Sequence, residues 1–396
     1  MTLDASAAPA ETLLPHVDRE AFARDLDALR AEVEASLGPD DRQHLLRIAG
    51  VGRLCTALGY ATAWMGPNPV SMALLSLGPT IRWTCVAHHI LHRGLDRVPG
   101  TPAHLTSKGF ARGRRRFVDW PDWLDPAAWD YEHNVLHHHR TGEAADPDLV
   151  EENATGLRDW QGPRALKLAA VGFYALTWKW SYYAPSTWQV LGRAEARRAR
   201  KEPIAPGVDA PTADARGPER YLEAFDPRTA AGRAFWRRCL APYGLARFVL
   251  GPLVFAPLGP GAVASVWANC VGAEMLGNLH TFVIIAPNHA GDDLYRFDGP
   301  TRDRGERYLR QVLGTVNFRT GGALRDLLHG YLNYQIEHHL FPDLPPRQYA
   351  RIQPRVRALC EKHGVPYVQE GVWRRARKMV RVMVGDETMR RPPTAP

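Results

Sequence analysis

The chain has 396 residues, of which 45% are hydrophobic and 23% are charged, and its formal net charge is +8. This composition excludes collagen-like, low-complexity and wholly disordered chains. A mean hydropathy of −0.32 excludes a compact transporter built almost entirely of spanning helices. The five cysteines are scattered without a Cys-x-x-Cys pair, so we expect neither a disulfide framework nor a thiolate metal site.

Four apolar stretches approach the roughly 20 residues that a membrane-spanning helix needs. They form two pairs with short connections: 46–66 and 70–90 are joined by Pro67-Asn68-Pro69, and 240–258 and 262–286 by Gly259-Pro260-Gly261. The connections carry no Lys or Arg, whereas the segments after residue 92 and between 190 and 240 are rich in both. This positive-inside pattern predicts an all-α polytopic membrane protein with two transmembrane helical hairpins. The rest of the chain, including both termini, is then expected on the cytoplasmic side.

Four buried core helices of a soluble protein are the alternative explanation of these stretches. A fifth apolar stretch, 165–178, is short, and if it crossed the membrane the Arg-rich stretch 193–238 would lie outside. We therefore predict that 165–178 lies at the membrane interface, with Trp178, Trp180, Tyr182 and Tyr183 near the lipid headgroups.

The chain is expected to have three parts. A polar N-terminal segment, 1–45, lacks the features of a signal peptide. A membrane and catalytic domain, 46–371, contains a Pro-, Ala- and charge-rich insertion near 192–226 that is expected to be partly disordered. The basic tail, 372–396, has apolar residues interleaved in 372–391, which suits either an anionic membrane surface or a solvated surface helix.

Histidine is the unusual residue type, with 16 in the chain. Three clusters contain most of the informative ones: His88-His89-Ile90-Leu91-His92, His133-Asn134-Val135-Leu136-His137-His138-His139, and Gln335-Ile336-Glu337-His338-His339. Helical residues four apart lie about 40° from each other, so His88 with His92, and His133 with His137, can each point at one metal. His138 and His339 are turned by roughly 100° and can reach a second metal beside the first.

A metal makes this arrangement favourable, because packed imidazoles lose hydration and repel one another when protonated. A neutral imidazole shell suits iron, copper, nickel or zinc and does not suit calcium or magnesium. Seven or more histidines exceed the ligands of one tetrahedral zinc. The clusters therefore predict a two-metal centre, for which iron is the metal suited to oxygen chemistry.

The three clusters resemble the three histidine boxes of the membrane fatty acid desaturase family, H-x3-H, H-x3-H-H and Q-x2-H-H. The stretches LNYQIEHHLFPDLP (332–345) and QVLGTVNFRTGGALRDLLHG (311–330) are similar to the third-box region of front-end acyl desaturases. The resemblance runs from about residue 70 to residue 370. The chain departs from the family pattern at His89, where Asp or Glu is usual, and at Gly142, where Asn usually follows Thr. It also lacks the His-Pro-Gly-Gly motif of a fused cytochrome b5 domain.

The resemblance implies a set of iron ligands: His88 and His92 from box one, His133, His137 and His138 from box two, His338 and His339 from box three, and His289 outside the boxes. Gln335 occupies a ligand position, but an amide is a weak iron ligand, so hydrogen bonding is the alternative role. His89 and His139 are surplus and are expected to support the centre or the fold, and His280 rivals His289 from deeper in apolar sequence. Asp146 and Asp148 match a family feature and could orient ligand imidazoles, or simply form a turn.

The implied function is an O2-dependent di-iron desaturase that introduces a double bond into a lipid- or CoA-linked acyl chain, in contact with membrane lipids and without a nucleic-acid partner. Because no cytochrome b5 domain is fused to the chain, a ferredoxin or a free cytochrome b5 is the expected electron donor. The Arg112–Arg116 run could dock that donor or serve as a topology signal, and Trp83, Trp120 or Trp123 could line an acyl tunnel.

Two other functions also fit the sequence. A hydroxylase or related oxygenase on the same scaffold could act on a lipid or a specialised metabolite. A non-enzymatic metal-binding membrane protein would also use clustered histidines. A soluble zinc hydrolase is not expected, because no HExxH motif or nucleophile elbow is present.

Overall fold

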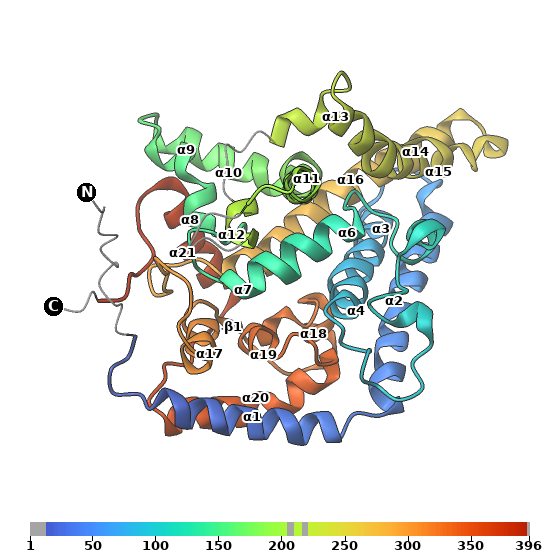
Figure 1. Ribbon diagram of the computed structural model, residues 1–396. Helices are drawn as coiled ribbons and strands as arrows, with labels where there is room; N and C mark the ends of the chain where they lie inside the picture. Colours follow the sequence, from blue (N-terminus) through green and yellow to red (C-terminus); the bar gives the residue numbers. More distant parts are fainter. Residues whose placement is uncertain (1–12, 204–209, 216–220, 394–396) are drawn as a thin grey trace.

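The structure is a computed structural model that describes residues 13–203, 210–215 and 221–393 (Figure 1). Helices dominate it, in agreement with the predicted all-α class. Two strands of two residues each, β1 (Asn317–Phe318) and β2 (Gln369–Glu370), pair in parallel, with Asn317 opposite Gln369. They hold the region before the third histidine cluster against the start of the C-terminal helix.

The N-terminal part consists of a surface helix and a helical hairpin. Its elements are α1 (Arg19–Ala35), α2 (Pro39–Ala63), α3 (Pro69–Ile81), a π-helical segment (Arg82–Ala87) and α4 (His88–Leu91). Phe22, Leu26 and Leu29 form the buried side of α1, at the helical spacing that apolar burial requires. This side faces α20 (Pro346–Lys362), and the two helices lie together at the bottom of Figure 1.

Glycines allow α2 and α3 to pack closely. A side chain at Gly78 of α3 would meet the carbonyl oxygen of Gly52 and the hydroxyl of Thr56 on α2, and one at Gly59 would meet Leu75. Close approach through small residues is the common way in which spanning helices associate. The connection contains Asn68, whose side chain caps α3 by accepting from the backbone N–H of Ser71, so the predicted turn at 67–69 is confirmed.

A second long hairpin follows in the sequence. One arm comprises α13 (Ala230–Phe235), α14 (Ala241–Leu245), α15 (Gly251–Leu253) and the intervening π-helical turns, and the other is α16 (Pro260–Ile285). The chain reverses at Gly259, whose φ of 96° favours glycine. α16 packs against α3 and α10 (Arg164–Trp178), and it carries the chain to the centre of the molecule (Figure 1).

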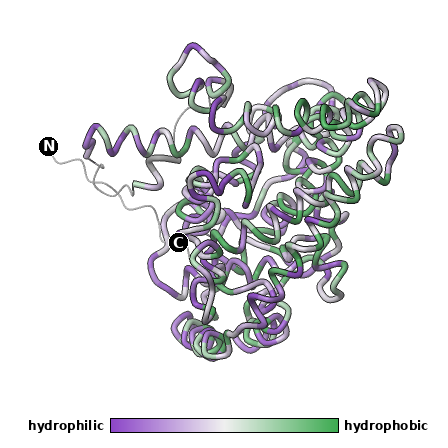
Figure 2. The backbone as a smooth tube through the Cα atoms, turned by 90° about the vertical axis from the view of Figure 1, so that its right-hand side faces the viewer, coloured by the Kyte–Doolittle hydropathy of each residue, from purple (hydrophilic) through white to green (hydrophobic). Residues whose placement is uncertain are grey.

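Within the described ranges, three helices are long and apolar enough to cross a membrane: Pro69–Leu91, Ala230–Leu258 and Pro260–Asn288. Only 28% and 39% of the apolar windows of the last two are buried inside the protein, so their outer faces suit a bilayer better than the core of a soluble protein. Figure 2 shows hydrophobic residues concentrated along the long helices at the upper right. The predicted span 46–66 is helical within α2 but is not among the three, because Arg47 and Arg53 interrupt its apolar sequence.

Short elements connect the two hairpins and cover the centre. They are α5 (Arg116–Asp119), α6 (Pro126–Trp129), a π-helical segment (Asp130–His137), α7 (His138–Arg140), α8 (Val150–Asn153), α9 (Thr155–Asp159), α11 (Ala184–Arg200) and α12 (Ala210–Ala215). Residues 192–200 of the predicted flexible insertion belong to α11, because their apolar side packs on the protein, with Ala194 buried. Residues 204–209 and 216–220 of that insertion lie outside the described residues.

The C-terminal part lies on the lower and left-hand sides of the molecule in Figure 1. It contains α17 (Arg304–Leu313), α18 (Ala323–Leu328), α19 (Gln335–Leu340), α20 and α21 (Val372–Val384). The predicted tail does not form a surface helix that is free of the body, because Met379, Val382 and Met383 of α21 are buried. Its interleaved apolar residues therefore pack against the protein itself.

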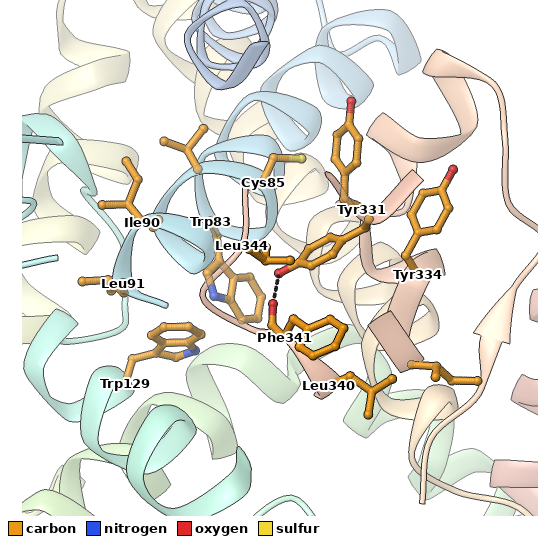
Figure 3. Packing of buried hydrophobic residues seen from close by; sticks show 14 of the residues in the cluster. Trp83, Cys85, Ile90, Leu91, Trp129, Tyr331, Tyr334, Leu340, Phe341 and Leu344 are labelled. Atoms are coloured by element: carbon orange, nitrogen blue, oxygen red, sulfur yellow. Dashed lines mark hydrogen bonds between the residues drawn. The ribbon is translucent and has the colours of Figure 1, made fainter. Parts of the chain in front are cut away.

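The main hydrophobic core surrounds the first and third histidine clusters. Figure 3 shows Trp83, Ile90 and Leu91 from the first hairpin and its extension, near Phe341 and Leu344 beyond α19. These side chains are almost fully buried. The core therefore holds α4 and α19 in place, and these two helices carry the first and third histidine clusters.

Close packing of α2 on α3 can be tested with a single added methyl group. Gly78→Ala should lower the apparent thermal unfolding midpoint in detergent, because the new Cβ would approach the Gly52 carbonyl oxygen within 2.8 Å; overpacking of this kind costs about 1–3 kcal/mol. Gly172→Ala on α10 is the matched control, since its Cβ meets nothing within 4 Å. An equal midpoint for the two variants would contradict close packing of the hairpin.

Candidate metal centre

The first histidine cluster ends the first hairpin. α3 widens into the π-helical segment Arg82–Ala87 directly before α4, and such widened turns are frequent at functional sites. His88 and His92 remain neighbours, with ring centroids 4.6 Å apart. Both are buried.

The second cluster lies in a π-helical segment rather than in the regular α-helix that the spacing predicts. His133 and His137 belong to the segment Asp130–His137, and their rings still stack, with centroids 5.0 Å apart and an interplanar angle of 21°. Trp129 stacks on the other side of His133, at 4.5 Å. The widened turn therefore keeps the expected pair together.

The third cluster is carried by α19, and His289 follows α16 after a short 3-10 turn. The side chains of His338 and His339 diverge, with an interplanar angle of 89°. Because their rings point in different directions, His338 and His339 can face two different groups of histidines, as the helical geometry predicts.

The eight histidines expected as ligands converge in overlapping groups. In each group the possible ligand atoms lie within 4.8 Å of one another: His88, His92, His133 and His338; His137, His289 and His339; His138, His338 and His339. Asp148 forms a further group with His133 and His137. The convergence therefore has the form of two neighbouring sites, with His138 beside both.

Many of these buried nitrogens have no hydrogen-bond partner among the described residues. They include Nε2 of His92, His133, His137, His138 and His339. Such atoms are costly when they are left without a partner, and a metal ion would accept their lone pairs. The donor set therefore fits metal binding, and its neutral nitrogens suit a transition metal.

Electrostatics keep most of these imidazoles neutral. Burial and the neighbouring His138 lower the pKa of His92 well below its ordinary range, and burial lowers that of His133 to about 4. The pKa values of His338 and His339 are lowered for the same reasons. Neutral imidazole is the form that binds a metal, so the site is prepared for ligation at neutral pH.

Hydrogen bonds set the orientation of several rings. Nδ1 of His137 donates to Oδ1 of Asp146 at 2.8 Å, and Nδ1 of His339 donates to Oε1 of Gln311 at 2.8 Å. Burial disfavours charge on His137, but Asp146 outweighs it and raises the pKa of that imidazole. In both cases the bond leaves Nε2 free to face the centre, which is how outer residues usually fix metal-binding histidines.

Gln335 connects two residues of the centre. Its amide nitrogen donates to Nε2 of His289 at 2.9 Å, while its oxygen accepts from Asn288 at 3.2 Å. Hydrogen bonding is therefore the role that the structure displays for this amide. Asp148 lies 3.8 Å from Nδ1 of both His133 and His137.

The three histidines among the possible site residues lie outside the groups. His89 is buried and donates from Nδ1 to the carbonyl of Cys85. His139 is exposed and donates to the carbonyl of Asn134, and His280 contacts the carbonyl of Leu328 at 2.7 Å. The structure therefore gives His280 no place beside His289.

Sequence reasoning missed two residues that contact the expected ligand histidines, Gln311 and Tyr349, and one buried carboxyl group that directly precedes such a histidine, Glu132. Gln311 bonds both His339 and the carbonyl of His138, Tyr349 lies 3.2 Å from Nδ1 of His338, and Glu132 is buried beside Tyr183. Glu132 directly precedes His133, and Gln311 begins the stretch that resembles the front-end enzymes. Position in the sequence was a signal for these two, whereas nothing local identifies Tyr349.

A mainly apolar cavity of about 300 Å³ opens onto the centre. On one side it is lined by His88, His133, His137, His289, Gln335 and Asp148, and on the other by residues such as Leu157, Val171, Tyr174, Phe282, Met379 and Met383. None of Trp83, Trp120 and Trp123, the residues predicted to line an acyl tunnel, lines this cavity. Trp83 instead packs on Trp178 and Tyr183, which are the residues that reach the cavity.

The sequence model of the fatty acid desaturase family matches residues 62–371, and this range contains all three clusters and His289. The chain belongs to the fatty acid desaturase family. As a member of that family it is an oxidoreductase that acts on fatty acyl chains, as the sequence predicts.

Several curated relatives support this assignment. The chain is 26% identical to the NADPH-dependent stearoyl-CoA 9-desaturase of Mycobacterium tuberculosis over 390 residues, covering 92% of this chain and 81% of the relative. It is 30% identical to the acyl-lipid (7-3)-desaturase of Rebecca salina over 257 residues, covering 62% of this chain and 50% of the relative. The Delta(8)-fatty-acid desaturase of Euglena gracilis is 35% identical over 95 residues, covering 24% and 22%.

The metal centre of this desaturase can be tested with two histidines from one cluster. His137→Ala should lower the bound metal, measured by elemental analysis of the purified protein, because it removes a buried nitrogen from two of the groups. His139→Ala should leave the metal content within error of the unchanged chain, because this exposed side chain lies outside the groups. Equal metal loss in both variants would contradict the arrangement.

Proposed function

We propose that this desaturase is an O2-dependent di-iron enzyme that introduces a carbon–carbon double bond into the acyl chain of a lipid or an acyl-CoA. The observation that carries the proposal is the apolar cavity that ends on imidazoles of both histidine groups. The cavity has room for a hydrocarbon chain, and it ends at histidines that are proposed to bind two transition metals.

The ligands proposed for one iron are His88, His92, His133 and His338, and those for the second are His137, His289 and His339, with His138 beside both. When bound, two iron ions would supply the oxygen activation that removes hydrogen from an unactivated methylene, which no side chain can do. His89 and His139 are proposed to support the fold of their segments, and Asp146 to orient His137.

The reaction balances with an external electron supply. The acyl chain loses two hydrogen atoms, and O2 takes these together with two electrons and two protons to give two molecules of water. A ferredoxin or a cytochrome b5 type protein is the proposed electron donor.

The protein holds the chain and excludes water. Leu157, Val171 and Phe282 offer apolar contact along the cavity, while Met379 and Met383 close one side. Burial of hydrocarbon against such walls contributes about 0.8 kcal/mol per methylene. This wall is proposed to hold one methylene of the chain beside His88, His133 and His137.

The proposed topology is two hairpins with the metal centre and both termini on the cytoplasmic side. It rests on the three helices that can cross a membrane, on the close packing of α2 against α3, and on the uncharged connections at 67–69 and 259–261. α10 fits an interfacial position, because Phe173 is 69% exposed although the opposite side of the helix lines the cavity.

The substrate is proposed to be membrane-associated. Relatives named for acyl-CoA and for acyl-lipid substrates both match this chain, and the cavity lies beside the exposed apolar face of α10. Both classes present the same hydrocarbon chain to the centre.

The deciding experiment is lipid mass spectrometry of a host that produces this chain with a ferredoxin and its reductase. A new species with two hydrogens fewer than a host acyl chain, absent with His137→Ala, is the expected result. A species with one additional oxygen would instead establish a hydroxylase or related oxygenase on the same centre. Bound metal without either product, even when a small chemical reductant supplies the electrons, would remove the acyl-chain assignment.

The acyl cavity can be tested by filling its wall. Ala170 lines the cavity, whereas Ala169, on the same exposed helix, does not. Ala170→Trp should reduce desaturation at least several-fold with unchanged metal content, because the indole occupies space required by the chain. Ala169→Trp is the matched control and should retain activity; equal loss in both would show that bulk on α10 matters and not the cavity.

A further inference from the structure

A second cavity reaches the histidine centre without sharing a lining residue with the acyl cavity. Its volume is about 410 Å³, and its walls include Arg30, Arg304, Arg307, Gln311, His139 and His339. We call it the arginine cleft. It lies between α1, α17, α7 and the end of α19, elements that are polar and outside the three candidate spans.

The cleft presents positive charge. Its lining contains three guanidinium groups and no carboxylate. Arg30 forms ion pairs with Asp343 and Glu34, and Arg304 forms an ion pair with Asp27. Arg307 is exposed and forms no ion pair with any described residue, so its charge is uncompensated locally.

Only one layer of side chains separates the cleft from the centre. His138 and His339 belong to the metal groups and also line the cleft, and their rings stack at 4.3 Å with an interplanar angle of 21°. Gln311 bonds His339 from the cleft side. An electron delivered here therefore arrives at the imidazoles without crossing the acyl cavity.

We propose that the arginine cleft is the docking site of an acidic one-electron donor protein, which binds twice per double bond. This inference rests on the proposed desaturase function, because that reaction consumes two electrons from outside the chain. Charge complementarity favours this occupant, since a carboxylate-rich surface would pair with the uncompensated Arg307. The electron passes to the centre through His339 and His138.

The Arg112–Arg116 run is a weaker docking site. Arg112 pairs with Asp130, Arg115 with Asp119 and Arg116 with Asp125, so Arg114 is the one arginine of the run without an ion pair to a described residue. None of these arginines lines the arginine cleft. Arg307 is therefore the better residue to vary.

The test compares Arg307→Glu with Arg319→Glu in isolated membranes. Arg319 is exposed, makes no ion pair with any described residue and does not line the cleft, so the two variants change the net charge equally. Initial rates of double-bond formation are measured against the concentration of a reduced ferredoxin or a soluble cytochrome b5 domain. Photoreduced deazaflavin, a small reductant, drives a parallel reaction without a protein donor.

For Arg307→Glu the half-saturating donor concentration should rise by about tenfold, because reversal of a rim charge slows association of an oppositely charged partner. Rates with deazaflavin should stay unchanged, and Arg319→Glu should behave like the unchanged chain. Added salt should raise half-saturation in the unchanged chain more than in Arg307→Glu.

Three results would overturn the proposal. Donor dependence could be equal in all three proteins, or deazaflavin-driven rates could fall with Arg307→Glu, which would place the cleft in the chemistry rather than in docking. Turnover with deazaflavin but with neither acidic donor would also remove it. Absence of product even with deazaflavin would instead reject the desaturase function, so the two failures can be distinguished.

Discussion

The structure depends on bringing many uncharged imidazoles together in one buried place. Each buried nitrogen without a partner costs about 1–3 kcal/mol, and among the described residues His92, His133, His137, His138 and His339 all carry such an atom. Metal binding supplies the missing partner. This cost explains why segments from four distant parts of the chain must end at the same point.

The backbone around the centre shows the same constraint. π-helical segments precede His88 and contain His133 and His137. Arg93 and Tyr331 adopt positive φ values of 68° and 62°, which non-glycine residues rarely do, and they flank His92 and α19. Such strain of about 1–3 kcal/mol per residue persists only where surrounding packing determines it, and the core of Trp83, Phe341 and Leu344 provides that packing.

Metal-binding residues that lie in short motifs could be predicted from the sequence, whereas the lining of a cavity formed by distant segments could not. The spacing of His88 with His92 and of His133 with His137 predicts ring pairs, because one turn of helix determines it. The lining of the acyl cavity depends on how α10, α16 and α21 approach one another, so Trp178 and Met379 could not be selected over Trp83. Tyr349 could not be predicted for the same reason, since its contact with His338 spans 11 residues and no local motif marks it.

The basic C-terminal helix illustrates how a local pattern can have more than one cause. Alternating charged and apolar residues in 372–391 suit a membrane surface, yet Arg375 is fully buried and binds Asp293 through two oxygens at 2.6 and 2.8 Å. The second terminal nitrogen of Arg375, Nη2, donates to the carbonyl oxygen of Ala290, the residue after His289. The same helix supplies Met379 and Met383 to the acyl cavity.

Because of these contacts, α21 joins the proposed substrate wall to the loop that carries His289. Methionine is flexible and adapts to the shape of its neighbours, whereas the Arg375–Asp293 pair is rigid and directional. In the proposed desaturase, Met379 and Met383 would adapt to acyl chains of different length or shape while the position of His289 is kept. Adaptable walls and fixed nitrogens are separate requirements of the same reaction, and one helix meets both.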